Sequence, residues 1–269
     1  PYSKRSTTDH RDGCQTWSVA SGPVPSQAPM CCTLEAGSQD ARRPRLGWPR
    51  GQPLTTTETK PLFRGVSHRT AFIASVTLTP IVVVSAPGLW PRLVTGLYTI
   101  AIVALFGVSA LYHRVNWGPV GRRRLQKFDH VTIFFAIAAT YTPVAAFVLS
   151  PWAAKLVLAL VWGGALIGAL LRVRFTQAPQ WVVAGPYLVV GWCLLAVVQD
   201  AWQQLGVLGF VLFLAGGLLY TAGAIVFASQ RPDPWPSMFG FHEIFHSLTV
   251  AAAALHYIAF VFVVLPKAQ

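Results

Sequence analysis

Two histidines near the carboxyl end of the chain have the spacing of a metal site. His242 and His246 are four residues apart in the string His242-Glu243-Ile244-Phe245-His246. On a helix, this spacing places both imidazoles on one face, about 6 Å apart along the axis, where they can bind one ion. The string also matches H-E-x-x-H, the zinc protease pattern in which the glutamate is the general base. We favour metal binding over proteolysis, because no acidic residue follows Glu243 and the third ligand must come from upstream.

A third histidine, His113, ends a separate apolar stretch and completes the predicted site. Three neutral histidines suit Zn²⁺ and leave the fourth tetrahedral position for water, as in catalytic zinc sites. We therefore predict that the metal ligands are His113, His242 and His246. The predicted catalytic residues are Asp129, which would orient or deprotonate the water, and Ser109, which would stabilise a charged intermediate. Ser109 lies one helical turn before His113, on the same face.

The remaining polar residues near the apolar stretches have more ordinary interpretations. Glu243 could be a base, a group that supports the ligands from outside the coordination sphere, or an interfacial side chain. His256 lies in the middle of an apolar stretch, off the face of the paired histidines, so we expect an internal hydrogen-bonded histidine. His68 and His130 adjoin basic loops and are predicted to be interfacial. Two acidic residues are predicted to be solvated in loops, Asp200 and Asp233.

The composition indicates a membrane protein. The 269 residues are 54% hydrophobic and only 11% charged, with a mean hydropathy of +0.50, whereas soluble domains carry about 25% charged residues. The net charge of +12 raises the alternative of nucleic-acid binding. We exclude that class because the basic residues lie between long uncharged stretches rather than along one face, and because no nucleic-acid-binding motif is present.

Seven apolar stretches of about 20 residues, the length that crosses a bilayer, follow residue 60. Short polar breaks separate them, and tryptophans lie in or beside these breaks, as expected at membrane interfaces. Internal prolines are tolerable because neighbouring helices satisfy the freed carbonyls. The predicted fold is an all-α membrane protein, a seven-transmembrane helix bundle. The predicted spans are Thr70–Ala86, Leu93–Tyr112, His130–Leu149, Trp152–Leu171, Trp181–Val198, Leu205–Ser229 and His242–Val264.

The basic residues beside the spans predict the orientation of the bundle. If the chain before the first span is cytoplasmic, eleven basic residues lie on that side and three on the other, in agreement with the positive-inside rule. We predict a cytoplasmic N-terminus and an external C-terminus, which places all the site residues near the cytoplasmic side. The eleven are Lys60, Arg64, Arg69, Arg114, Arg122, Arg123, Arg124, Lys127, Arg172, Arg174 and Arg231, and the three are Arg92, Lys155 and Lys267.

Residues 1–60 differ in composition from the rest of the chain. They are rich in Ser, Thr, Pro and Gly, have a basic balance, and lack the periodicity of a helix or a strand. We predict a disordered leader without an assigned function, followed by a transmembrane domain over residues 61–269. The four cysteines lack a metal-binding spacing and are predicted to be thiols: Cys14, Cys31, Cys32 and Cys193.

The polar residues discussed above lie in short strings. These include Ser109-Ala110-Leu111-Tyr112-His113, Phe128-Asp129-His130, Ala139-Thr140-Tyr141-Thr142-Pro143 and Phe241-His242-Glu243-Ile244-Phe245-His246. In this order the strings resemble the hemolysin III family, the bacterial branch of the progestin and adipoQ receptor superfamily. The resemblance covers residues 62–265. It implies a seven-helix bundle with zinc near the cytoplasmic leaflet, held at His113, His242 and His246, with Asp129 contacting it through water. Ala139 stands where the family has Gly, a departure that should not disturb the metal.

Three functions follow from the predicted zinc site and from the resemblance. The first is hydrolysis of a lipid amide or ester, and the similarity of the metal-site residues to those of alkaline ceramidases makes a ceramide-like amide the expected substrate. The second is a pore-forming or cytolytic protein, as the family name implies. The third is a receptor or a regulator of membrane homeostasis with structural zinc. In each case we expect a multi-pass protein of the plasma membrane whose partners are membrane lipids, and the sequence leaves the oligomeric state open.

Overall fold

The computed structural model describes residues 61–175 and 179–268. Within these ranges the long elements are α-helices, and one isolated β-bridge joins Trp235 to Phe239. The prediction of an all-α membrane bundle is confirmed. The predicted leader, with Cys14, Cys31 and Cys32, lies outside the described residues. The helices are α1 (Val66–Ser85), α2 (Leu89–Arg114), α3 (Pro119–Phe147), α4 (Pro151–Arg174), α5 (Gln180–Gly191), α6 (Val198–Ser229) and α7 (Phe241–Ala259).

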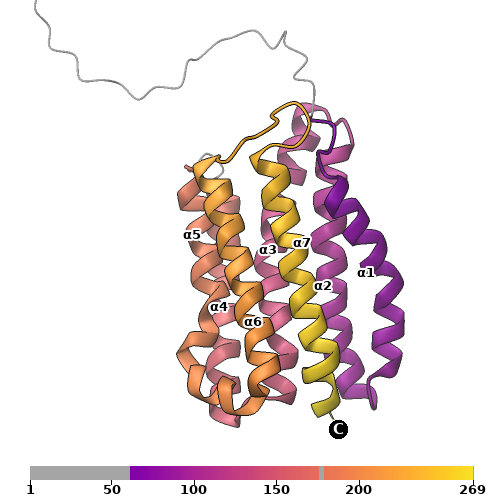
Figure 1. The fold of residues 1–269 in the computed structure, drawn as a ribbon, viewed down its shortest axis with the longest axis vertical. Helices are drawn as coiled ribbons and strands as arrows, with labels where there is room; N and C mark the ends of the chain where they lie inside the picture. The colour runs from indigo at the N-terminus through magenta and orange to yellow at the C-terminus, as the bar shows by residue number, and fades with distance from the viewer. Residues whose placement is uncertain (1–60, 176–178, 269) are drawn as a thin grey trace, which may run out of the picture. The chain divides into compact units, whose positions relative to one another are not determined.

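Successive helices run in opposite directions (Figure 1). In this view α1 begins at the upper end, α2 returns to it, and α3 and α7 start from it, while the C-terminus lies at the lower end. The Leu62 N–H donates a hydrogen bond to the Ser237 carbonyl (3.2 Å), which joins the segment before α1 to the connection between α6 and α7. The helix ends that carry the predicted metal ligands therefore meet at one end of the bundle.

Four of the predicted spans correspond to single helices, namely α1, α2, α3 and α4, and the seventh corresponds to α7 followed by a π-helical segment, η2 (Phe260–Val264). The largest difference is at α3, which begins at Pro119 rather than at the predicted His130. Its first turns contain four basic residues, Arg122–Arg124 and Lys127, so hydropathy alone does not detect this part of the helix. Pro119 suits the first helical position, where its missing N–H has no intrahelical partner to lose.

The connection between the fifth and sixth predicted spans is helical, which corrects the predicted loop there. A 3₁₀ turn, η1 (Cys193–Val197), follows α5, and α6 begins directly after it at Val198. Gly206 interrupts α6 with φ 69° and ψ 176°, a conformation that is almost restricted to glycine. By length and composition, six helical segments in the described ranges could cross a membrane, because Trp181–Ser229 forms one segment of 49 residues. The count of seven crossings stays a prediction.

The interior of the bundle contains many small residues, and its exterior is apolar. Ala138 is fully buried, whereas Val189 and Phe262 on the outer surface are 75% and 70% exposed. Helices approach closely at Gly216 of α6, where an added Cβ would lie 2.4 Å from the ring of His256 in α7. Small residues at helix contacts and large apolar side chains on the outside suit a lipid environment, where packing rather than water exclusion holds helices together.

Candidate metal site

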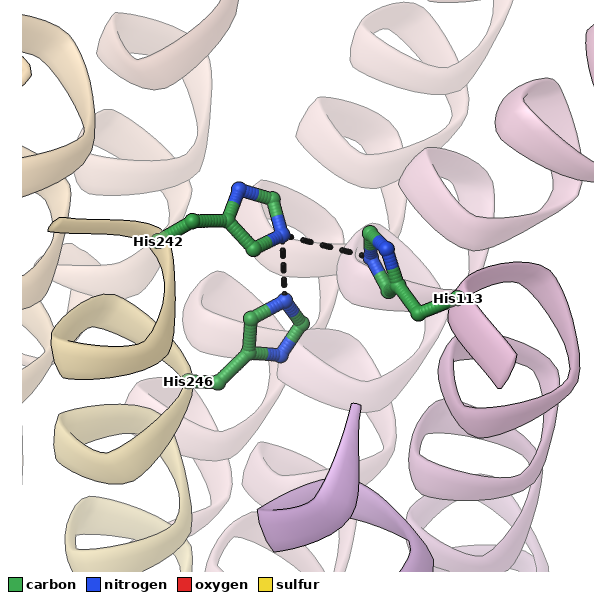
Figure 2. Close-up of side chains that lie close together, drawn as sticks. All are labelled: His113, His242 and His246. Carbon is green, nitrogen blue, oxygen red and sulfur yellow. Dashed lines mark hydrogen bonds between the residues drawn. The ribbon is translucent and has the colours of Figure 1, made fainter. Parts of the chain in front are cut away.

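The structure brings the three predicted metal ligands together. His113 lies in the last turn of α2, and His242 and His246 lie in the first two turns of α7. The Nε2 atom of His242 lies 3.3 Å from Nε2 of His113 and 2.7 Å from Nε2 of His246. Figure 2 shows the three rings pointing toward one another from the two helices. One nitrogen from each ring can be chosen so that all three lie within 4.8 Å of one another.

These nitrogen atoms fit the coordination of a divalent transition metal. With Zn–N bonds of 2.0–2.1 Å, two ligands of a tetrahedral site lie about 3.3 Å apart. The separation between His113 and His242 already has this value. The separation between His242 and His246 is shorter, so the two α7 rings would move apart by about 0.6 Å to accept an ion. An all-imidazole donor set suits zinc and other first-row divalent ions.

Glu243 fixes the first turn of α7 rather than facing the cavity beside the histidines. The Gly240 N–H donates to Glu243 Oε2 at 2.9 Å, which caps the helix, and Arg64 Nε lies 2.7 Å from Glu243 Oε1. The carboxylate is only 3% exposed. Of the three interpretations of Glu243, the structure therefore favours a group that supports the ligands from outside the coordination sphere.

His68 is a fourth histidine at the site, and the prediction that it is interfacial is wrong. It is 3% exposed, and its Nδ1 and Nε2 atoms lie 2.9 and 2.8 Å from Nδ1 of His246. Its neighbours Arg64 and Arg69 led to the interfacial interpretation. A usable signal was present, because the alternating topology places the start of α1, where Gly65 is the N-cap three residues before His68, at the same end of the bundle as the ligands.

The two predicted catalytic residues lie together beside the histidines. Ser109, which is 2% exposed, and the carboxyl group of Asp129 form a side-chain hydrogen bond between α2 and α3. Ser109 precedes His113 by one helical turn, so the pair lies about 6 Å along the α2 axis from a metal ligand. The packing of α2 against α3 therefore places an acidic group near the imidazoles.

A cavity of about 960 Å³ is lined by the three histidines, Ser109 and Asp129. It lies among α2, α3, α5, α6 and α7 and also reaches His256, which is 14 residues after His242 in α7. This separation corresponds to roughly 20 Å along the helix axis. Apolar and aromatic side chains form much of the remaining wall, including Ile133, Ile137, Leu188, Tyr220 and Phe245. The cavity volume suits a small organic ligand. One end of the cavity is polar, and its interior is mainly apolar.

The other polar residues mostly have structural roles. His256 is an internal hydrogen-bonded histidine as predicted, because its Nε2 lies 3.1 Å from the Phe213 carbonyl. The prediction that His130 is interfacial needs correction, since it lines the cavity and its Nε2 lies 3.4 Å from Arg172 Nη2. Asp200 was predicted to lie in a loop but lies in the first turn of α6.

Asp200, in the first turn of α6, accepts a hydrogen bond from the Ser150 N–H at 3.0 Å. Asp233 is exposed in the connection between α6 and α7, as predicted. Cys193 is a free thiol, also as predicted.

Comparisons with known proteins match most of this chain. The family described as Haemolysin-III related matches residues 56–257. Hemolysin-3 of Bacillus cereus is 29% identical over 174 residues, which cover 64% of this chain and 75% of that protein. The human Monocyte to macrophage differentiation factor is 28% identical over 180 residues, 63% of this chain and 70% of that protein. The Heptahelical transmembrane protein ADIPOR2 of Oryza sativa subsp. japonica is 28% identical over 193 residues, with coverages of 63% and 80%.

Proposed function

The chain belongs to the haemolysin-III related family, and we propose that it is a plasma-membrane enzyme that hydrolyses a lipid amide or ester at a zinc site. The ligands would be His113, His242 and His246. One observation carries the proposal: three Nε2 atoms from two helices converge at the polar end of a large cavity whose other walls are mainly apolar. Neutral imidazoles that converge in this way can share one cation.

The proposed chemistry divides between the ion and the residues around it. A zinc ion held by the three imidazoles would supply Lewis acidity and would make water acidic enough to lose a proton near neutral pH. The carboxylate of Asp129 accepts a proton from the attacking water and later returns it to the leaving amine or alcohol as the C–N or C–O bond breaks. Ser109 holds Asp129 by its hydrogen bond and is placed to stabilise charge on the carbonyl oxygen.

The substrate class follows from the shape and lining of the cavity. Its length of roughly 20 Å along α7 and its apolar wall suit a long acyl chain, with the carbonyl group at the end that holds the histidines. The resemblance of the site residues to those of alkaline ceramidases favours an amide such as that of a ceramide. The partners are membrane lipids, and the N-terminus is cytoplasmic.

The test is lipid hydrolysis by the purified full-length protein in nanodiscs. Release of fatty acid from a ceramide and from an ester lipid is measured for the wild type and for His246→Ala and Asp129→Asn. We expect turnover that both substitutions reduce by at least about 100-fold. Asp200→Asn is the matched control, because Asp200 lies in the first turn of α6, outside the cavity lining, and it should retain turnover.

The same preparation distinguishes the two alternatives. The relative from Bacillus cereus is named Hemolysin-3. A cytolytic function, which that name suggests, predicts dye release from liposomes that His246→Ala and Asp129→Asn leave unchanged. A receptor or regulator with structural zinc predicts metal binding and a stability that depends on the metal, without turnover of either lipid. Either result, obtained with folded protein, would overturn the hydrolase proposal.

A further inference from the structure

We propose that His68 is a positioning residue of the metal site, which holds His246 so that its Nε2 atom faces the ion and which leaves the fourth coordination position open. The inference rests on the proposed zinc site. It deepens that proposal by assigning a role to a buried histidine outside the ligand set of His113, His242 and His246.

The geometry places His68 behind His246 as seen from the metal position. Nε2 of His246 faces His242 at 2.7 Å, and its other nitrogen, Nδ1, faces both nitrogens of the His68 ring at 2.9 and 2.8 Å. The two rings meet edge to face, with centroids 3.9 Å apart and an interplanar angle of 77°. His246 is therefore held on both sides of its ring.

Through this contact His68 would select the tautomer of His246. A neutral imidazole has one N–H, and the other nitrogen carries the lone pair that binds a metal. If Nδ1 of His246 donates its N–H to a nitrogen of His68, then Nε2 is left with its lone pair toward His113 and His242. In metal sites this support usually comes from a carboxylate or a backbone carbonyl. A neutral imidazole acceptor adds no negative charge, so the ion would keep its full Lewis acidity.

The same contact keeps His68 out of the coordination sphere. A histidine that bonds to Nδ1 of His246 cannot at the same time bind the ion at Nε2, because the two nitrogens lie on opposite sides of the imidazole ring. The group of described residues whose ligand atoms converge contains His113, His242 and His246 but not His68. With three protein ligands, the tetrahedral site keeps a position for water or substrate, as catalytic zinc sites do.

The surroundings of His68 hold it in this position. The ring packs edge to face against Phe106 of α2, with centroids 5.2 Å apart, and the residue is 3% exposed. Gly65, at the N-cap of α1, has φ 72°, and a Cβ there would lie 2.8 Å from Cβ of His113. The start of α1 therefore packs directly on the end of α2, and a helix-end histidine becomes part of the buried cluster.

The experiment compares two substitutions of similar volume in the purified full-length protein. His68→Gln keeps a carboxamide oxygen that can accept the His246 N–H, whereas His68→Leu has no acceptor. Dissociation constants are measured for Zn²⁺ and Co²⁺, and the visible absorption of bound Co²⁺ reports the coordination geometry. We expect His68→Leu to weaken binding by about 10- to 100-fold and to change the Co²⁺ spectrum, and His68→Gln to stay within a few-fold of the wild type. The control is His256→Gln. It changes another buried histidine, whose ring contacts the Phe213 carbonyl rather than His246.

The possible results are distinguishable. If the wild type binds neither ion, the proposed zinc site fails. If the wild type binds and His68→Leu binds equally with an unchanged spectrum, the positioning role fails while the zinc site stands. If both variants lose the metal as completely as His246→Ala, His68 is a ligand and the inference is overturned. Circular dichroism checks folding, and His68→Ala replaces His68→Leu if leucine prevents folding.

Discussion

The guanidinium group of Arg64 lies 2.7 Å from the carboxylate of Glu243, the residue that the H-E-x-x-H pattern would make a general base. The second oxygen of that carboxylate accepts the Gly240 N–H. Both oxygens thus have partners that belong to the helix start and to the segment before α1. The pair joins α7 to the beginning of α1, and so it holds His246 and His68 at a fixed separation.

Glu243→Gln should separate a structural role from a catalytic one. The amide can still accept the Gly240 N–H but loses the charge that pairs with Arg64, so we expect a loss of about 1–3 kcal/mol in the free energy of unfolding. Thermal unfolding in detergent measures this change. Metal content and any hydrolytic turnover should stay within a few-fold of the wild type. A folded, metal-loaded Glu243→Gln protein whose turnover fell 100-fold would restore the general-base interpretation.

Removing the ligands should remove the metal. We expect about one equivalent of zinc per wild-type chain by elemental analysis, and a loss to background in the triple variant His113→Ala, His242→Ala, His246→Ala. Zinc should also be released as the pH falls, because protons compete with the ion for the imidazole nitrogens. Asp129→Asn should retain the metal, since this residue is proposed to act through water. Equal zinc content in the wild type and the triple variant would refute the site.

Gly65→Ala tests the contact between α1 and α2. The residue has φ 72°, and the new Cβ would meet His113 Cβ at 2.8 Å, so we expect a loss of about 1–3 kcal/mol in stability and weaker metal binding. The control for the contact is Gly88→Ala, where φ is 80° and nothing lies within 4 Å of the added Cβ. That variant carries the backbone strain alone. Thermal unfolding and Zn²⁺ titration of both proteins measure the difference, and equal metal affinities would argue against the contact.

The orientation of the bundle can be tested with single cysteines in a cysteine-free background. Asn116 lies between α2 and α3, and Pro87 lies between α1 and α2; both are exposed. If the N-terminus is cytoplasmic, a membrane-impermeant maleimide should label Pro87→Cys in intact cells and Asn116→Cys only after permeabilisation. The reverse pattern would invert the topology, and labelling of both sites in intact cells would contradict a crossing by α2.

The sequence determined the membrane character of this protein, most of its helices and the three metal-ligand candidates. These features depend on local properties: apolar length sets a membrane span, and a spacing of four residues sets a shared helix face. The convergence of His113 with His242 and His246 was predictable, because the alternating direction of the spans places their ends at one side of the membrane. The start of α3 at Pro119 was missed because its first turns are basic rather than apolar.

Only the tertiary structure decided the roles of His68, Glu243 and His130. His68 and Glu243 lie in the first turns of α1 and α7, and His130 follows the basic first turns of α3. A solvated side chain is the ordinary outcome for polar residues in such sequence contexts. The packing of α1 against α2 and α7 buries His68 on His246, and the start of α7 brings Glu243 to Arg64. Whether a polar side chain is exposed or buried depends on what packs opposite it. That partner is distant in sequence here, 178 residues away for His68 and His246, so no local pattern contains it.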